Sequence, residues 1–326
     1  MSGKLRIEVL HTHDQTQSGA WQKAVLNFPG ATVFHDPCFL KYHGTRFEEH
    51  HLGVYKGDEL FGLIPLAMFR EKEATEVRSP YGGSYGGFVF AADLSYAQAK
   101  EVLDLFHQYL LEVGVSGITI TPSLPVYHRN PDDTLLFALL ADGYEVSNTD
   151  LVHAMMLEGV SDVSEQLLSA SARRHVKKAL KNEVRCVVDA PADDFWVTVG
   201  KTFEKHGVSA THTFEQWQWL CTELPDRFSA DVAYVGDQPV AGIGRVRITP
   251  DVDSAFYICQ DPDFQDSQAL SLLLLTSVED AISKGCRVFD LGTSSVKMVA
   301  RENIFRFKES FGARGVSRRT LTKKLQ

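Results

Sequence analysis

The sequence predicts an α/β protein built from two copies of one unit, in which helices flank a mixed sheet. The main observation is that one order of elements occurs twice along 326 residues: a hairpin, a strand, a helix, a strand, a helix and a last strand. Each copy has its hairpin at a Gly-Asp pair, Gly57-Asp58 in the first half and Gly236-Asp237 in the second. A chain of this length is also comfortable for two domains.

In the first half, alternating apolar residues predict a strand at 5–10, and a short helix follows at 20–26. Pro37 is placed as the first residue of another short helix that runs on through Leu40. Two β-rich runs then surround Gly57-Asp58. The remaining predicted elements are a glycine-rich loop at 79–87, a helix at 94–114, a strand at 118–121, a helix at 134–143 and a strand at 144–147.

The second half opens with a helix predicted over 163–182 and then repeats the order of the first. Its predicted elements are a hairpin at 229–248, a strand at 252–260, a helix at 267–285, a strand at 287–291, a helix from 302 and a last strand at 313–321. We expect the two halves to join near 157–162.

Composition excludes several classes of protein. Hydrophobic residues make up 44% and charged residues 23%, and the longest apolar runs fall short of the ~18 residues that a membrane helix needs. The start of the chain has no apolar segment of the signal-peptide type, so we expect a cytoplasmic protein without an integral membrane segment. Five scattered cysteines indicate neither a disulfide framework nor a zinc site. A net charge of −9 argues against a DNA partner.

Histidines occur in two close pairs, His11 with His13 and His50 with His51. No set of carboxylates at metal-ligand spacing accompanies either pair, so we expect no metal site.

The stretch 287–315 concentrates the chemistry. A short strand ends at Gly292, and a helix from Glu302 follows a loop. At 100° per residue, Ile304, Phe305, Phe307 and Phe311 form one apolar arc of this helix, and Lys308 falls inside it. Such a lysine either extends its ammonium past the edge of the core or points it into a lined cavity with a negative partner. Gly312 is placed to end the helix.

This stretch resembles the C-terminal signature of the FemAB-like branch of the GNAT acyltransferase superfamily. Members show F-D-F-G-x-S, then an asparagine, a short gap and Y/F-K-x-x-F-G. The matching positions in this chain are Phe289, Asp290, Leu291, Gly292, Ser294, Asn303, Phe307, Lys308, Phe311 and Gly312. The resemblance implies two tandem GNAT-like domains, residues 1–157 and 158–326. The first half has no lysine in its helix at 134–143 and no Gly-x-Ser in the loop before it, so we infer that it is scaffold and cleft wall and that the second half is catalytic.

The resemblance also implies a function. FemAB-like proteins join acyl groups or amino acids to amines, and the match extends to acyltransferases linked to cellulose or exopolysaccharide. We therefore expect an N-acyltransferase or aminoacyltransferase that acts on a carbohydrate- or peptide-linked amine, in cell-envelope or exopolysaccharide metabolism. The alternative is a catalytically silent module that binds an anionic polymer or carrier.

Acyl transfer to an amine needs an acceptor for the amine's proton and donors to the oxyanion. We predict Lys308, Asp290 and Asn303 as catalytic, with Lys308 as a fixed positive charge. Asp290 takes the proton or, equally well, caps the loop amides after Gly292. Ser294, Phe307, Tyr81 and Tyr85 are predicted substrate contacts, the two tyrosines on the loop 79–87, which lacks the Gly-Lys-Ser/Thr of a phosphate loop.

The predicted helix 163–182 carries a basic stripe. Its members share one arc and are Arg173, Arg174, Lys177, Lys178 and Lys181. A solvated helix face explains most charge runs, but an anion site for a nucleotide diphosphate, a tRNA backbone or carrier phosphates is an equal alternative here.

The turn 260–269 stands where GNAT proteins cradle the diphosphate of CoA. It has no glycine and three aspartates, which work against a diphosphate, so we expect free CoA to bind poorly. We predict no tightly bound cofactor. The donor is an acyl thioester or an aminoacyl-tRNA as co-substrate, and the lack of the helical arm of some bridge-forming enzymes disfavours tRNA.

Overall fold

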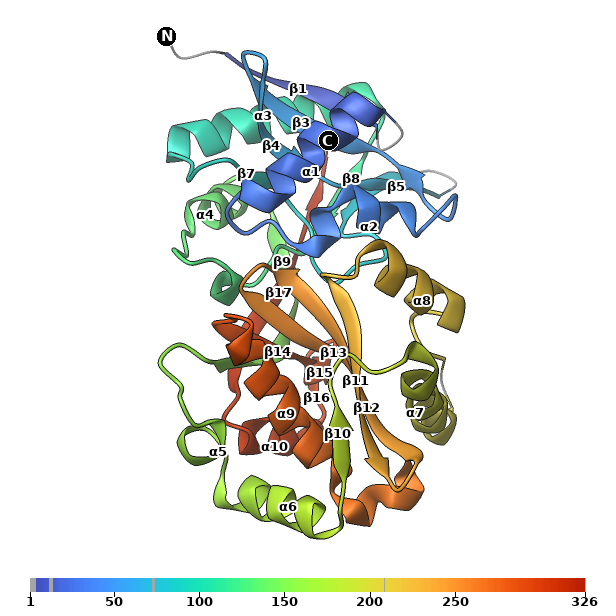
Figure 1. Ribbon diagram of the computed structural model, residues 1–326. Coiled ribbons are helices and arrows are strands. Elements are labelled where there is room, and N and C mark those ends of the chain that lie inside the picture. The colour runs from blue at the N-terminus through green and yellow to red at the C-terminus, as the bar shows by residue number, and fades with distance from the viewer. Residues whose placement is uncertain (1–3, 12–13, 72–73, 208, 326) are drawn as a thin grey trace. The chain divides into compact units, whose positions relative to one another are not determined.

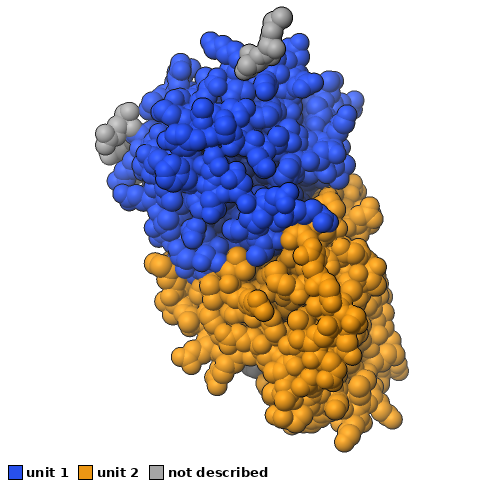
Figure 2. Space-filling view, turned by 90° about the vertical axis from the view of Figure 1, so that its left-hand side faces the viewer, with its two compact units in different colours: residues 1–150, 317–326 blue, residues 151–316 orange. Residues whose placement is uncertain are grey.

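The computed structural model describes residues 4–11, 14–71, 74–207 and 209–325 (Figure 1). The chain forms two compact units, coloured separately in Figure 2. Unit 1 is Met1–Asp150 with Ser317–Gln326, and unit 2 is Leu151–Val316. The division thus falls a few residues before the 157/158 boundary expected from the sequence, and the end of the chain belongs to the first unit.

Unit 1 contains helices on mixed sheets. Its helices are α1 (Gln15–Asn27), α2 (Pro37–Lys41), α3 (Tyr96–Glu112) and α4 (Thr134–Ala141). Its strands are β1 (Leu5–Leu10), β2 (Glu48–Glu49), β3 (His51–Lys56), β4 (Glu59–Ile64), β5 (Ala67–Arg70), β6 (Thr75–Ser79), β7 (Val89–Phe90), β8 (Gly117–Ile120), the start of β9 (Glu145–Met156) and the end of β17 (Arg314–Lys324). The end of β17 pairs with β8, which explains why the last residues belong to this unit.

Unit 2 has one six-stranded series, in the order β10, β11, β12, β13, β14 and the end of β9. Its strands are β10 (Arg185–Val187), β11 (Phe228–Val235), β12 (Gln238–Thr249), β13 (Val252–Gln260), β14 (Val288–Thr293), β15 (Ser295–Val296) and β16 (Val299–Ala300). Its helices are α5 (Val163–Gln166), α6 (Ala170–Lys181), α7 (Ala192–His206), α8 (Phe214–Glu223), α9 (Ala269–Ser283) and α10 (Glu302–Ser310).

The two units repeat one topology, which confirms the predicted duplication. β3 and β4 form a hairpin that turns at Gly57-Asp58, and β11 and β12 form one that turns at Gly236-Asp237. The strand before each hairpin, β1 or β10, pairs antiparallel with its first strand. Further on, β6 pairs parallel with β8 as β13 pairs parallel with β14. The two Gly-Asp turns therefore lie on equivalent elements.

Strand β12 shows why unit 2 has helices on both faces. Ala241 and Ile243 belong to the apolar cluster that contains the leucines of α9. Gly242 and Gly244 point the other way, where a Cβ at Gly242 would lie 2.2 Å from Thr198 of α7. This alternation places α9 on one face and α7 on the other, as Figure 1 shows.

The prediction of a single helix over 163–182 is wrong. It divides into α5 and α6, because Ser169 caps α6 with its hydroxyl and its N–H donates to the carbonyl of Ser310. Helices α7 and α8 were not predicted. None of the helices in the described ranges combines the length and apolar character that a membrane crossing requires.

Candidate active site

The central feature of unit 2 is the place where β13 and β14 part. The two strands pair in parallel over three positions, from Val252 with Val288 to Ser254 with Asp290. Beyond these positions both strands continue, to Gln260 and Thr293, without pairing with each other in the described chain. We call this unpaired region the strand opening. An unpaired strand edge offers main-chain N–H and C=O groups to an extended ligand.

A bulge in each strand accounts for the opening. In β13, Phe256 is the extra residue, because Gly244 and Arg245 of β12 pair with Tyr257 and Ala255. In β14 the register against β9 shifts between Asp290 and Thr293. Bulges bend a strand and increase its local twist, and they are frequent beside active sites. Both bulges follow the last paired position at once, so the strands diverge there.

The end of β14 is held by a network of short hydrogen bonds. The carboxylate of Asp290 accepts from the N–H of Gly292 at 2.6 Å, and Gly292 has a φ of 73°. The ammonium of Lys308 donates to the carbonyls of Gly292 and Thr293, both at 2.8 Å. The N–H of Ser294 donates to the carbonyl of Leu151 at 2.7 Å. The loop therefore has a fixed conformation, and Asp290 caps it as one of its two predicted roles requires.

Lys308 is buried, with 4% of its surface exposed, so its ammonium does not extend into solvent. Burial lowers the pKa of Lys308 to about 8, and the nearby carboxylate of Asp290 partly opposes this shift. Two of the three N–H groups of the ammonium are used by the loop carbonyls. Among the described residues, these two carbonyls are its hydrogen-bond acceptors. Gly312 ends α10 with a φ of 79°, and the N–H of Ala313 returns to the carbonyl of Lys308.

His153 on β9 is a site residue that the sequence did not reveal. Its Nδ1 lies 2.7 Å from the hydroxyl of Ser294, and its ring packs edge-on against Phe305. Burial lowers the pKa of His153, and the positive charge of Lys308 lowers it further. Its Nε2 is 3.8 Å from the carboxylate of Glu309. A lone histidine in a strand gives no signal, because strand pairing alone brings it to Ser294.

A pocket of about 790 Å³ begins where α10 starts, and we call it the α10 pocket. It is lined by Thr202, Phe203, Ile258, Arg301, Glu302, Asn303 and Ile304. Ile258 belongs to the unpaired part of β13, and the N–H of Arg301 donates to the carbonyl of Ser294. The pocket is thus tied to both strands of the opening.

The structure places the predicted site residues of the stretch 287–315 at three locations. Asp290, Ser294 and Lys308 come together at the end of β14. Asn303 instead lines the α10 pocket and accepts a hydrogen bond from Arg306 at 2.9 Å. Phe307 packs against the apolar core beside Phe311.

Unit 1 has no counterpart of the strand opening within its described residues. The pairing of β6 with β8 runs on through a bridge between Gly86 and Pro122. Tyr81 and Tyr85 of this loop are each 3% exposed. The hydroxyl of Tyr81 donates to Glu49 at 3.1 Å, and the guanidinium of Arg318 lies over the ring of Tyr85. As substrate contacts, these tyrosines remain a prediction.

The basic stripe lies on α6, whose opposite face packs on α9. Two of its members have acidic partners: Arg173 lies 3.0 Å from Glu165, and Lys178 lies 3.8 Å from Asp266. Arg174, Lys177 and Lys181 are exposed.

The turn before α9 keeps its acidic character. Asp261 is buried and accepts from the N–H of Asp263 at 3.0 Å, whereas Asp263 and Asp266 are exposed. The hydroxyl of Ser267 accepts from the N–H of Ala269, the first residue of α9.

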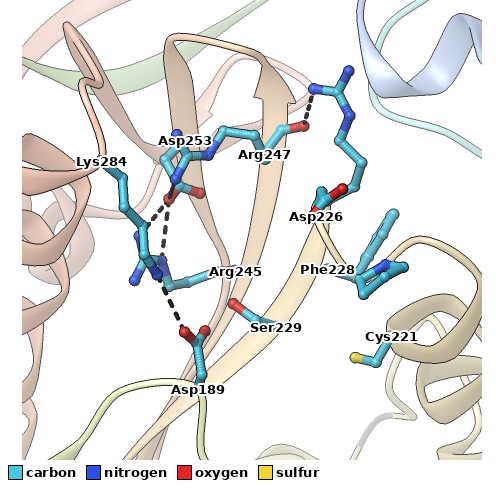
Figure 3. Close-up of a pocket in the computed structure, with 11 residues that line it drawn as sticks. Asp189, Cys221, Asp226, Phe228, Ser229, Arg245, Arg247, Asp253 and Lys284 are labelled. Carbon is cyan, nitrogen blue, oxygen red and sulfur yellow. Dashed lines mark hydrogen bonds and ion pairs between the residues drawn. The ribbon is translucent and has the colours of Figure 1, made fainter.

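A second cavity of about 410 Å³ lies at the other end of β13 (Figure 3). Buried Arg245 bonds there to three carboxylates, Asp231, Asp253 and Asp280. Lys284 joins Asp189 to Asp280. These cations and carboxylates pair with one another, so we place the candidate site at the strand opening. His13 lies outside the described residues; elsewhere, no group of three or more His, Cys, Asp or Glu residues could hold a metal ion.

One protein-family model matches most of the second half of the chain. Residues 168–309 match the model of the acetyltransferase (GNAT) domain. Comparison with curated proteins gave no match.

Several solved structures share the fold of the entire chain. FemX covers 98% of this chain and 97% of its own, with 12% identity and a TM-score of 0.71. The C-terminal domain of a putative lysylphosphatidylglycerol synthetase from Agrobacterium fabrum has 10% identity and a TM-score of 0.61, covering 94% of this chain and 91% of its own. A tandem GNAT protein from the clavulanic acid biosynthesis pathway has 12% identity and a TM-score of 0.57, covering 99% of each chain. These similarities show the fold, two tandem GNAT-like domains.

Proposed function

Because residues 168–309 belong to the GNAT acetyltransferase domain family, and the chain is an enzyme of that superfamily, we propose that it transfers an acyl or aminoacyl group to an amine at the strand opening of unit 2. The observation that carries this proposal is the open edge of β13 beside a buried ammonium. An extended donor chain bonds along that edge as an added strand would. The carbonyl of the donor then lies near the end of β14.

Lys308 has two tasks in this proposal. Its bonds to Gly292 and Thr293 fix the loop, and its remaining N–H places a positive charge near the developing oxyanion. Asp290, engaged by the N–H of Gly292, orders the loop, and its carboxylate favours the charged form of Lys308. The acceptor amine enters through the α10 pocket, where Asn303 and Glu302 supply polar groups. The new amide bond forms as the bond between the donor carbonyl and the leaving thiol or tRNA hydroxyl breaks. The proton of the amine passes, directly or through water, to that leaving group.

The acceptor we propose is a carbohydrate- or peptide-linked amine of cell-envelope or exopolysaccharide metabolism, as the sequence resemblance implies. The donor is an acyl thioester or an aminoacyl-tRNA, with the exposed cations Arg174, Lys177 and Lys181 of α6 as the binding surface for its phosphates. The exposed carboxylates of Asp263 and Asp266 oppose CoA binding at the turn before α9.

A transfer screen tests the proposal. The purified protein is incubated with acetyl-CoA or a mixture of aminoacyl-tRNAs and with glucosamine or a lysine-containing peptide, and products are identified by mass spectrometry. A protein-dependent acylated amine that disappears in Lys308→Met supports it. Absence of transfer from every donor, with polyanion binding lost in Lys177→Gln/Lys181→Gln, would instead identify a binding module.

A further inference from the structure

The connection between β14 and α10 contains a small hairpin whose tip is apolar and exposed. Strands β15 and β16 pair through Ser295 with Ala300 and Val296 with Val299. Three side chains at the tip are largely accessible: Val296 at 46%, Met298 at 65% and Val299 at 69%. No other segment of comparable length in the described part of unit 2 exposes three large apolar residues.

The turn of this hairpin has an unfavourable backbone. Lys297 and Met298 have φ angles of 50° and 61°, where Asn-Gly would be the ordinary choice. Side chains other than glycine are strained in this region. The sequence nevertheless keeps a lysine and a methionine at the tip, so a long cation and a flexible apolar side chain both project there.

The charge of the segment differs from that of the chain. Residues 295–301 include two cations, Lys297 and Arg301, and no carboxylate, in a protein with a net charge of −9. Both cations are exposed. Apolar side chains flanked by cations are typical of segments that insert into the surface of an anionic bilayer, because the cations remain at the level of the lipid head groups.

The size of the tip favours lipid over a protein partner. A stable protein interface needs roughly 800 Å² on each side, formed by some 20 to 30 residues. A single small hairpin with three exposed apolar side chains does not supply such a surface. Separate side chains can each enter the acyl region of a bilayer without a complementary partner surface.

We propose that the β15–β16 hairpin is a membrane-docking tip that binds the surface of an anionic phospholipid bilayer. Arg301, which ends the segment, also lines the α10 pocket. Docking would therefore place one rim of the pocket near the head groups. The inference is independent of the acyl-transfer proposal, because lipid binding is measured without donor or acceptor.

Vesicle sedimentation tests the proposal. Vesicles of phosphatidylcholine alone are compared with vesicles that also contain phosphatidylglycerol. We expect the protein to bind the anionic vesicles at low salt, and the double variant Met298→Ser/Val299→Ser to bind at least ~10-fold more weakly. Lys297→Gln should weaken binding to anionic vesicles only. The matched control is Val197→Ser, which removes a 49% exposed valine of α7, outside the hairpin.

Four results would overturn the proposal. The wild type could fail to bind anionic vesicles, or the double variant could bind as well as Val197→Ser. Binding lost in Lys177→Gln/Lys181→Gln and retained in the tip variants would assign it to α6 instead. An oligomer seen by size-exclusion chromatography and lost in the double variant would assign the tip to a second copy of the chain. Unfolding midpoints measured on every variant exclude misfolding as the cause.

Discussion

Replacing Lys308 with methionine separates the catalytic from the structural consequences of its buried charge. Methionine keeps the stem of the side chain and removes both hydrogen bonds to the carbonyls of Gly292 and Thr293. Each carbonyl left without a donor costs at least ~1 kcal/mol. In the opposite direction, a pKa lowered from 10.5 to about 8 means that holding the ammonium costs roughly 3 kcal/mol, at 1.36 kcal/mol per unit.

The two effects are similar in size, so Lys308→Met should change the free energy of unfolding by less than ~1.5 kcal/mol. If the ammonium faces a developing oxyanion, turnover should instead fall ~100- to 1000-fold. Urea unfolding and turnover are measured on the same preparation. Turnover within a few-fold of the wild type would refute the catalytic role.

The pH dependence of stability gives a second comparison of the wild type with Lys308→Met. A lowered pKa means that the unfolded chain binds the proton of Lys308 more tightly than the folded chain does. The stability contributed by the neutral amine of Lys308 is thus fully present above pH 10.5 and is lost as the pH falls towards 8. The wild type should gain up to ~3 kcal/mol relative to Lys308→Met over this range. An equal pH dependence in the two proteins would mean that the charge is not buried in solution.

Three further predictions concern other parts of the molecule. The imidazole of His35 accepts from the N–H of Thr32 at Nδ1, and burial lowers its pKa to about 4. The stability contributed by neutral His35 is then fully present above pH 6.5, and roughly 3 kcal/mol of it is lost as the pH falls through 4. His35→Gln should lack this loss in acid unfolding. An acid-unfolding profile equal to that of the wild type would contradict the prediction. Arg245→Met leaves buried Asp231 without its cation and Asp253 with Arg247 alone, and it should cost ~3–5 kcal/mol in urea unfolding. Arg70→Met, at an exposed ion pair, should change urea unfolding far less, and equal losses would show that the cluster is hydrated. Free CoA should bind weakly in calorimetry, and micromolar binding abolished by Asp263→Ala/Asp266→Ala would show that the acidic turn accepts a diphosphate.

Local patterns predicted much of the fold. The strand predicted at 252–260 has the observed bounds of β13, and the two Gly-Asp pairs predicted both hairpins. One strand was predicted too short because its pairing is distant in sequence. β9 was predicted to end at residue 147 but runs to Met156, because its second half pairs with β14.

The candidate site was predictable only where its residues lie close together in the sequence. Asp290, Ser294 and Lys308 lie within one stretch of the chain, so a motif reveals them. His153 is 141 residues from Ser294, and only the pairing of β9 with β14 brings the two together. The burial of Tyr81 and Tyr85 likewise depends on distant partners, Glu49 and Arg318, which no local pattern indicates.

Filling the strand opening tests the central claim most directly. Ile258 is a half-buried residue of the unpaired part of β13 that lines the α10 pocket. Ile258→Trp should leave urea unfolding close to that of the wild type. Transfer between the donor and the amine found in the screen should fall on the order of 100-fold, because a small displacement of the donor is enough to reduce the rate. Val197→Trp, an exposed position of α7, is the matched control and should retain activity. Wild-type transfer by Ile258→Trp would contradict the account and show that the reaction occurs elsewhere.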